Sequence, residues 1–197
     1  MQIDYYFSVL SPFAYLADDR LERIAAQRGA AVTYKPLDIL ALFDATGGTP
    51  PKQRHRSRQE YRAQELPRLA ARLGMPLNLQ PAHWPTDQKP ASAMIEAAQI
   101  AGEEAGTLAQ AVLRAVWAEE KDIADPDTVA GLVQGCGIDP AALAPHLDRA
   151  VSLFDRRLEE AQQAGAFGSP FYVTADGARF FGQDRLDHFD DHLADAS

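Results

Sequence analysis

A serine and a proline, Ser11 and Pro12, separate a short apolar stretch, residues 3–9, from a run of apolar residues at helical spacing. Serine is a favoured N-cap and proline is favoured at the first helical position, so a helix should begin here. A hydroxyl at a helix start can donate a hydrogen bond to an anion, beside backbone N–H groups that are free. Because this turn has no thiol, thiol chemistry here would need a sulfur atom from another molecule.

The elements that must position this turn alternate between strand and helix at both ends of the chain. Residues 3–9 and 31–36 read as strands on either side of a helix over 12–28, which predicts a βαβ unit with parallel strands. Near the other end we expect a helix, a hairpin across Asp176-Gly177 and a last helix. The ranges of these three elements are 152–165, 171–173 with 178–181, and 185–194.

The middle of the chain shows only helical periodicity. The expected helices cover residues 59–73, 91–103, 108–119, 126–135 and 140–147. This order of elements is that of an α/β protein, a thioredoxin-like domain interrupted by an all-helical insertion. We therefore expect the thioredoxin-like domain in residues 1–45 and 148–197, and the inserted helical domain in residues 46–147.

A second candidate site is Gly168-Ser169-Pro170, directly before the first strand of the hairpin. Thioredoxin-like folds place a cis-proline at this point, facing the N-terminal turn. In a cis X–Pro bond, the residue before the proline can offer its backbone N–H and C=O to a bound peptide. We therefore predict that Ser169–Pro170 is cis and faces Ser11.

Three segments in this order carry a family resemblance. They are residues 7–16 around Ser11-Pro12, residues 46–52 with the sequence Thr-Gly-Gly-Thr-Pro-Pro-Lys, and residues 165–186 around Ser169-Pro170. Together with the helices between them, these segments resemble the 2-hydroxychromene-2-carboxylate isomerases. That family is related to the kappa-class glutathione transferases and to disulfide oxidoreductases, and the similarity spans essentially the whole chain.

The resemblance implies a role for each matching residue. Ser11 matches the catalytic serine that orients the thiolate of the cofactor glutathione. Ser169 and Pro170 match the cis-proline pair that receives the tripeptide backbone. Gln183 and Asp184 match the segment that holds the γ-glutamyl end, where a carboxylate would accept from the ammonium group. The alternative for Asp184 is a plain helix N-cap.

The activity that the resemblance implies is a glutathione-dependent isomerisation of a small aromatic acid. The thiolate would add to 2-hydroxychromene-2-carboxylate, allow rotation about a former double bond and leave, which yields trans-o-hydroxybenzylidenepyruvate. The alternatives are a kappa-like glutathione transferase that conjugates aromatic electrophiles, and a non-catalytic thioredoxin-like binding module. Disulfide exchange fits poorly, because Ser11 and Ala14 stand where oxidoreductases have cysteines. Relatives suggest a homodimer.

The basic run at residues 52–58 has two interpretations. Lys52 and Arg58 could bind the carboxylate of an aromatic acid or the glycyl carboxylate of glutathione, or the run could be a solvated loop before a helix. The chain also departs from the family here. Gly48 stands where many relatives have an asparagine, and Arg58 stands where they have a lysine, so both positions bear on glutathione binding.

Composition excludes several classes of function. The chain has 197 residues with 19 Lys and Arg against 28 Asp and Glu, a formal net charge of −9, which argues against nucleic acid. No apolar run is long enough to span a membrane, and Asp4 does not suit a signal peptide, so we expect a cytoplasmic protein without a membrane partner. One cysteine, Cys136, excludes an internal disulfide. No histidine pairs with the cysteine, and charge complementarity explains His188 and His192, at i, i+4 on an aspartate-rich helix, better than a zinc site does, so we expect no metal.

Aromatic residues offer an apolar wall for a substrate. His83-Trp84-Pro85 in a proline-rich loop could form such a wall together with Phe43, Tyr15 and Trp117. The alternative for each of these aromatic residues is a place in the hydrophobic core.

Overall fold

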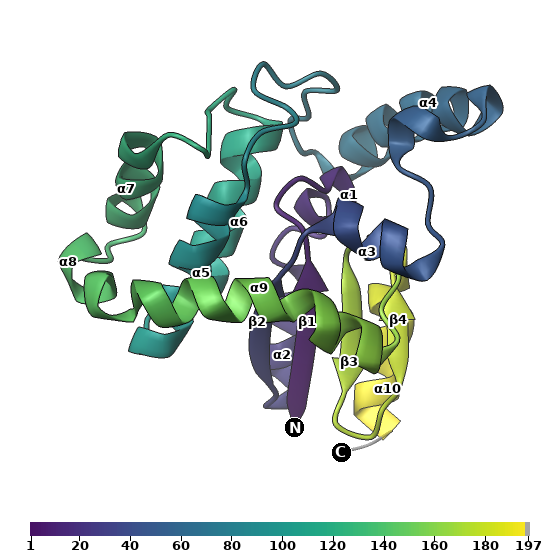
Figure 1. The fold of residues 1–197 in the computed structure, drawn as a ribbon. Coiled ribbons are helices and arrows are strands. Elements are labelled where there is room, and N and C mark those ends of the chain that lie inside the picture. The colour runs from purple at the N-terminus through teal and green to yellow at the C-terminus, as the bar shows by residue number, and fades with distance from the viewer. Residues whose placement is uncertain (196–197) are drawn as a thin grey trace.

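The computed structural model describes residues 1–195 and centres on one four-stranded sheet (Figure 1). The strands are β1 (Gln2–Phe7), β2 (Ala31–Pro36), β3 (Phe171–Thr174) and β4 (Arg179–Phe181), in the order β2-β1-β3-β4. β1 runs parallel to β2, and β3 runs antiparallel to both β1 and β4. The predicted βαβ unit and C-terminal hairpin are confirmed, in a thioredoxin-like arrangement with helical elements between the two halves.

Ten α-helices surround the sheet in the described residues. They are α1 (Pro12–Tyr15), α2 (Arg20–Arg28), α3 (Ile39–Thr46), α4 (Arg56–Leu73), α5 (Lys89–Ala101), α6 (Ala105–Trp117), α7 (Pro126–Gly135), α8 (Pro140–Leu143), α9 (Leu147–Ala164) and α10 (Leu186–Asp195). Three 3₁₀ turns, η1 (Pro51–Gln53), η2 (Ala144–His146) and η3 (Gln183–Arg185), complete the elements. α9 packs against both α3 and α5, and the division into two domains stays a prediction.

The predicted helix over 12–28 is wrong, because the chain breaks it into α1 and α2. Asp18 lies in the left-handed region with φ of 51°, and the intervening residues form a turn. The guanidinium of Arg20 donates to the carbonyls of Leu16, at 2.9 Å, and Ala17, at 3.1 Å. These bonds satisfy carbonyls left open at the end of α1. α1 therefore has only four residues, and its dipole is far smaller than that of the predicted helix.

Two other helices differ from the sequence prediction. The sequence analysis did not predict α3, because its eight residues are almost all apolar and show no separate polar and apolar faces at helical spacing. The helix is capped by Asp38, whose carboxylate accepts from Leu40 N–H at 2.9 Å. α9 begins at Leu147 rather than near 152, whereas the predicted helix over 140–147 is only the short α8 followed by η2. Pro145 explains that shortening, since a proline inside a helix removes a hydrogen bond.

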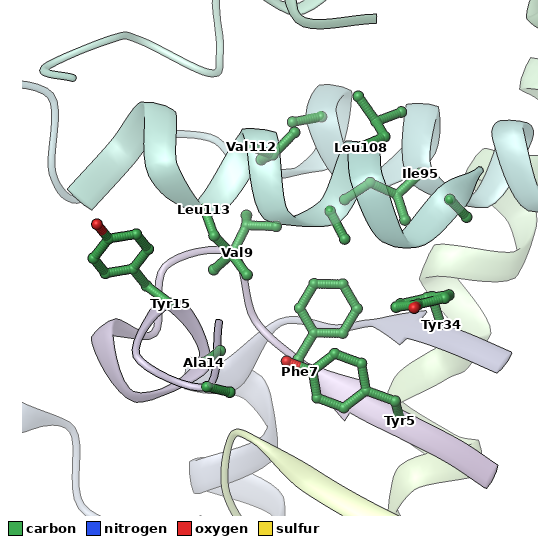
Figure 2. Close-up of a cluster of buried hydrophobic side chains, with 14 of the residues drawn as sticks. Tyr5, Phe7, Val9, Ala14, Tyr15, Tyr34, Ile95, Leu108, Val112 and Leu113 are labelled. Atoms are coloured by element: carbon green, nitrogen blue, oxygen red, sulfur yellow. The ribbon is translucent and has the colours of Figure 1, made fainter. Parts of the chain in front are cut away.

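The two faces of the sheet bury different aromatic side chains. Tyr5 stacks on Phe7, with ring centroids 4.5 Å apart, and on Tyr172, at 5.2 Å, on the face that Tyr34 also lines. Figure 2 shows Tyr5, Phe7 and Tyr34 beneath helical side chains that include Ile95. On the opposite face, a second cluster packs against α3 and α9. Its central residues are Tyr6, Leu37, Leu42, Ala161 and Phe171.

A buried ion pair ties α9 to α5. Arg157 Nε donates to Glu96 Oε1 at 2.6 Å and Arg157 Nη2 donates to Glu96 Oε2 at 2.8 Å. The side chains are only 7% and 0% exposed. Such a bidentate bond is specific in geometry. It fixes the helical block, residues 46–147, against α9, the helix that leads back to the sheet.

Replacing Arg157 tests whether this ion pair stabilises the fold. Arg157→Leu should lower the free energy of unfolding by about 3–5 kcal/mol, because the Glu96 carboxylate is then buried without a partner. Denaturant titration measures the change. The double variant Glu96→Leu/Arg157→Leu should recover most of the loss. Arg56→Leu is the control, because Arg56 is 88% exposed. If Arg157→Leu lowers the free energy of unfolding no more than this control does, the pair has no structural role.

Candidate functional site

Ser11 occupies the N-cap of α1, as predicted, and its side chain makes two hydrogen bonds. Ala14 N–H donates to Ser11 Oγ at 3.2 Å, and Ser11 Oγ donates to the backbone carbonyl of Ser169 at 3.1 Å. A carbonyl can only accept, so the single proton of the Ser11 hydroxyl is committed to Ser169. The structure therefore brings together the two segments that were expected to face each other.

The Ser169–Pro170 peptide bond is cis, as predicted. The hydroxyl of Ser169 accepts from Ser8 N–H at 2.9 Å, which holds the residue against the end of β1. The backbone N–H groups of Ser169 and Phe13 make no hydrogen bond within residues 1–195, and both residues line the same pocket. The site therefore offers two free backbone donors and one carbonyl, which is a set that a peptide backbone can pair with.

The turn between β1 and α1 is held from beneath by a buried polar pair. Ser8 Oγ donates to Gln88 Oε1 at 2.9 Å and accepts from Leu10 N–H at 3.2 Å. Ser8 is fully buried and Gln88 is 7% exposed. Because unpaired polar groups are costly at such depth, these bonds fix the backbone on which Ser11 stands.

Two tryptophans hold the same turn from the side of the helical block. The indole of Trp117 donates to the carbonyl of Val9 at 3.3 Å, and that of Trp84 donates to the carbonyl of Leu10 at 3.2 Å. The two rings lie against each other with centroids 5.9 Å apart. The peptide bond after Trp84 is also cis, a feature that was not predicted. The helical block therefore contributes directly to the position of Ser11.

A pocket of about 490 Å³ opens in front of Ser11. Its lining is mainly apolar, with three cationic side chains, and contains no aspartate or glutamate. The lining residues are Leu10, Ser11, Pro12, Phe13, Ile39, Leu40, Phe43, Pro50, Pro51, Lys52, Gln53, Arg54, Arg62, Trp84, Pro85, Gly168, Ser169 and Phe181. This volume and lining suit a small ligand that combines an aromatic ring with negative charge.

Of the two predicted cations, Lys52 lines this pocket and Arg58 lines an adjoining groove. The Lys52 ammonium lies 5.9 Å from the centroid of the Trp84 ring. Sequence reasoning included Arg54 only as a member of the basic run and missed Arg62, although both line the pocket. The signal available for Arg62 is its i, i+4 spacing from Arg58, which places both residues on one side of α4.

Gln183 and Asp184 do not line the pocket. Gln183 is buried, and its side-chain carbonyl accepts a hydrogen bond from Arg20. Asp184 is exposed and forms an ion pair with Arg185 at 2.8 Å. Their roles toward a γ-glutamyl group stay predictions, and a ligand could reach Asp184 only by extending beyond the pocket.

The predicted aromatic wall is partly wrong. Phe43 and Trp84 line the pocket, but Tyr15 and Trp117 are core residues with exposed fractions of 3% and 1%. The hydroxyl of Tyr15 donates to the carbonyl of Pro76 at 2.6 Å, so this tyrosine anchors the proline-rich loop. Both residues were expected at the wall because their helices were known only as periodic patterns, without the direction of each side chain.

Two further positions bear on the site. A Cβ atom at Gly48 would lie 2.6 Å from Cδ1 of the pocket residue Phe43, so an asparagine here would need Phe43 to move. Cys136 lies outside this pocket, at a separate cavity of about 300 Å³, and burial raises the pKa of its thiol. It therefore does not take part in chemistry at Ser11. Within residues 1–195, no helix is long and apolar enough to cross a bilayer.

Comparison with known proteins identifies relatives over almost the whole chain. The family model of the DSBA-like thioredoxin domain matches residues 2–194. A 2-hydroxychromene-2-carboxylate isomerase of Pseudomonas putida is 30% identical over 191 residues, which are 94% of this chain and 91% of the relative.

Solved structures agree with the sequence matches. A structure of 2-hydroxychromene-2-carboxylate isomerase has a TM-score of 0.79 at 27% identity and covers 100% of this chain and 96% of its own. The cytosolic disulfide reductase DsbM of Pseudomonas aeruginosa with GSH has a TM-score of 0.70 at 18% identity, over 98% of this chain and 96% of its own. The second likeness shows a shared fold.

Replacing Gln88 tests the support beneath Ser11. Gln88→Leu removes the acceptor of the buried Ser8 hydroxyl, so the free energy of unfolding should fall by about 1–3 kcal/mol. Gln134→Leu, on an exposed glutamine of α7, is the matched control and should change the free energy of unfolding little. Equal denaturation midpoints for the two variants would show that the Ser8–Gln88 bond contributes nothing.

Proposed function

This chain belongs to the family of DSBA-like thioredoxin domains and, within it, to the 2-hydroxychromene-2-carboxylate isomerases, and from that membership we propose that it isomerises 2-hydroxychromene-2-carboxylate with the help of bound glutathione. Membership of the second family makes the chain an isomerase. The observation that carries the proposal is the Ser11 hydroxyl, held against the carbonyl of Ser169 at the mouth of an apolar, cationic pocket.

The groups around Ser11 fit a cysteine-containing peptide. Ser169 presents a free N–H and a carbonyl, and Phe13 presents a free N–H beside the Ser11 hydroxyl. A peptide cysteine can pair with the first two groups, which leaves its sulfur near the other two. A disulfide reductase that shares this fold has been solved with GSH, which supports glutathione as the ligand. Because α1 has only four residues, stabilisation of the anion would depend on these local donors.

Ser11 must exchange a hydrogen bond before it can act on a thiolate. Its one proton points to the Ser169 carbonyl in the structure described here. When a cysteinyl N–H of the ligand donates to that carbonyl, the hydroxyl proton is free to turn to the sulfur without leaving the carbonyl unpaired. We infer that recognition of the peptide backbone and stabilisation of the thiolate are coupled through Ser169.

The remaining residues bind and orient. Glutathione, when bound, supplies a thiolate that adds to an electrophilic carbon of the substrate and then leaves, so that no net oxidation occurs. Phe43 and Trp84 pack against the aromatic ring and exclude water. We propose Lys52 and Arg58 for the glycyl carboxylate of glutathione. Gln183 and Asp184 are proposed for the γ-glutamyl end of an extended tripeptide.

A homodimeric state and a cytoplasmic location complete the proposal. The family resemblance implies the homodimer, and the cytoplasmic location is the expectation from the sequence. The partners in this proposal are a small aromatic acid, glutathione and a second copy of the chain.

An absorbance assay of chromene ring opening tests this function. The purified protein should accelerate the reaction only when glutathione is present, and the glutathione should be recovered unchanged. Ser11→Ala should lower turnover about 10- to 100-fold, because a hydrogen bond to a charged group contributes about 1.5–3 kcal/mol. Ser152→Ala, on an exposed serine of α9, is the control and should keep full turnover. Activity independent of glutathione would reject the proposal, and a stable conjugate would favour the transferase.

The coupling through Ser169 has its own test. A glutathione analogue in which an ester oxygen replaces the cysteinyl N–H cannot free the Ser11 proton. The pKa of the thiol, normally about 8.5, should fall on binding of glutathione but not on binding of the ester. Ultraviolet absorbance of the thiolate, followed against pH in each complex, measures both values. An equal fall in pKa for the two ligands would show that Ser11 acts without the exchange.

A further inference from the structure

Two arginines of the pocket have no acidic partner. Arg54 Nε donates to the carbonyl of Thr49 at 2.8 Å, and its guanidinium carbon lies 5.5 Å from the centroid of the Phe43 ring. Arg62 makes no side-chain hydrogen bond and no ion pair within residues 1–195. Both side chains are half-buried and line the pocket in front of Ser11. Each guanidinium therefore keeps several N–H donors available for a ligand.

Several other arginines of the chain do pair with carboxylates. On the helix that carries Arg62, Arg56 contacts Glu60 at 2.6 Å, and Arg68 contacts Glu65 at 3.8 Å. The chain as a whole has nine more acidic than basic residues. The pocket of this acidic protein contains cations and no carboxylate. Its positive charge therefore favours an anionic ligand.

Holding these cations together has an energetic cost. Burial lowers the pKa of Arg62, and the neighbouring Arg54 charge lowers it further. The pKa of Arg54 is lowered by burial and by the charge of Arg58. A guanidinium nevertheless stays protonated at physiological pH, so the like charges persist and repel one another. An anion placed between them would remove this repulsion.

We propose that Arg54 and Arg62 bind the carboxylate of the aromatic acid, with its ring packed against Phe43 and Trp84. This inference deepens the proposed function, on which it rests for the identity of the acid. A guanidinium can hold a carboxylate through two parallel hydrogen bonds, which fixes orientation as well as affinity. The aromatic residues then hold the ring in the part of the pocket that Ser11 also lines.

The same chemistry could serve a second carboxylate. The glycyl end of glutathione also carries one, and the pocket in front of Ser11 is open to both ligands. The two sources can be separated, because the binding of an aromatic acid can be measured without glutathione present. Binding experiments on the separate ligands therefore assign the arginine pair to one of them.

Calorimetry with trans-cinnamate and its neutral amide, cinnamamide, tests the proposal in the absence of glutathione. Cinnamate should bind the wild-type protein at least about tenfold more tightly than cinnamamide, because only the acid carries the charge. Arg62→Gln and Arg54→Gln should each weaken cinnamate binding about tenfold and leave cinnamamide binding unchanged. Arg72→Gln removes the same charge from an exposed position near the end of α4 and should change neither affinity.

The outcomes separate this inference from the proposed function. Cinnamate and cinnamamide of equal affinity for the wild-type protein would overturn the inference, and that comparison needs no variant. Arg62→Gln could instead leave cinnamate binding unchanged and weaken glutathione binding about tenfold, without weakening the binding of glutathione glycinamide. That result would assign the arginine pair to glutathione and would also overturn the inference. A protein that binds cinnamate through the arginines but opens no chromene ring would retain the inference and reject the isomerase.

Discussion

The hydrogen bond from the Ser11 hydroxyl to the Ser169 carbonyl joins residues that are 158 positions apart in the chain. The sheet makes this contact possible, because β1 and β3 pair antiparallel with Tyr6 opposite Phe171. That register places the end of one strand beside the start of the other, so the helix cap and the cis-proline meet at the same edge. The bond also occupies the hydroxyl proton of Ser11, so in the proposed mechanism backbone recognition must free that proton first.

The helical block does more than cover the sheet. Trp84, Gln88 and Trp117 all come from it, and all three hold the turn on which Ser11 stands. The cations of the pocket come from the segment that begins this block and from α4 (Figure 1). The Ser11 hydroxyl and the edge that we propose for peptide binding therefore come from the thioredoxin-like elements, whereas the helical block supplies support, apolar walls and positive charge.

Local signals in the sequence were enough to predict the serine cap and the order of strands, because a few neighbouring residues favour one backbone conformation. The cis-proline was predicted from the place of Pro170 in that order of elements, since an isolated X–Pro bond favours trans. The break between α1 and α2 was not predictable in this way, because it depends on Arg20 folding back onto two carbonyls. The directions in which the side chains of Tyr15, Trp117 and Arg62 point depend on tertiary packing. The sequence analysis therefore placed Tyr15 and Trp117 at the pocket and did not identify Arg62.

A crystal structure of the protein with glutathione tests the central claim most directly. The account predicts that the Ser11 hydroxyl lies within hydrogen-bond distance of the sulfur, and that the Ser169 carbonyl accepts from the cysteinyl N–H instead. Glutathione bound with its sulfur remote from Ser11, and with the bond from Ser11 to Ser169 intact, would contradict the account.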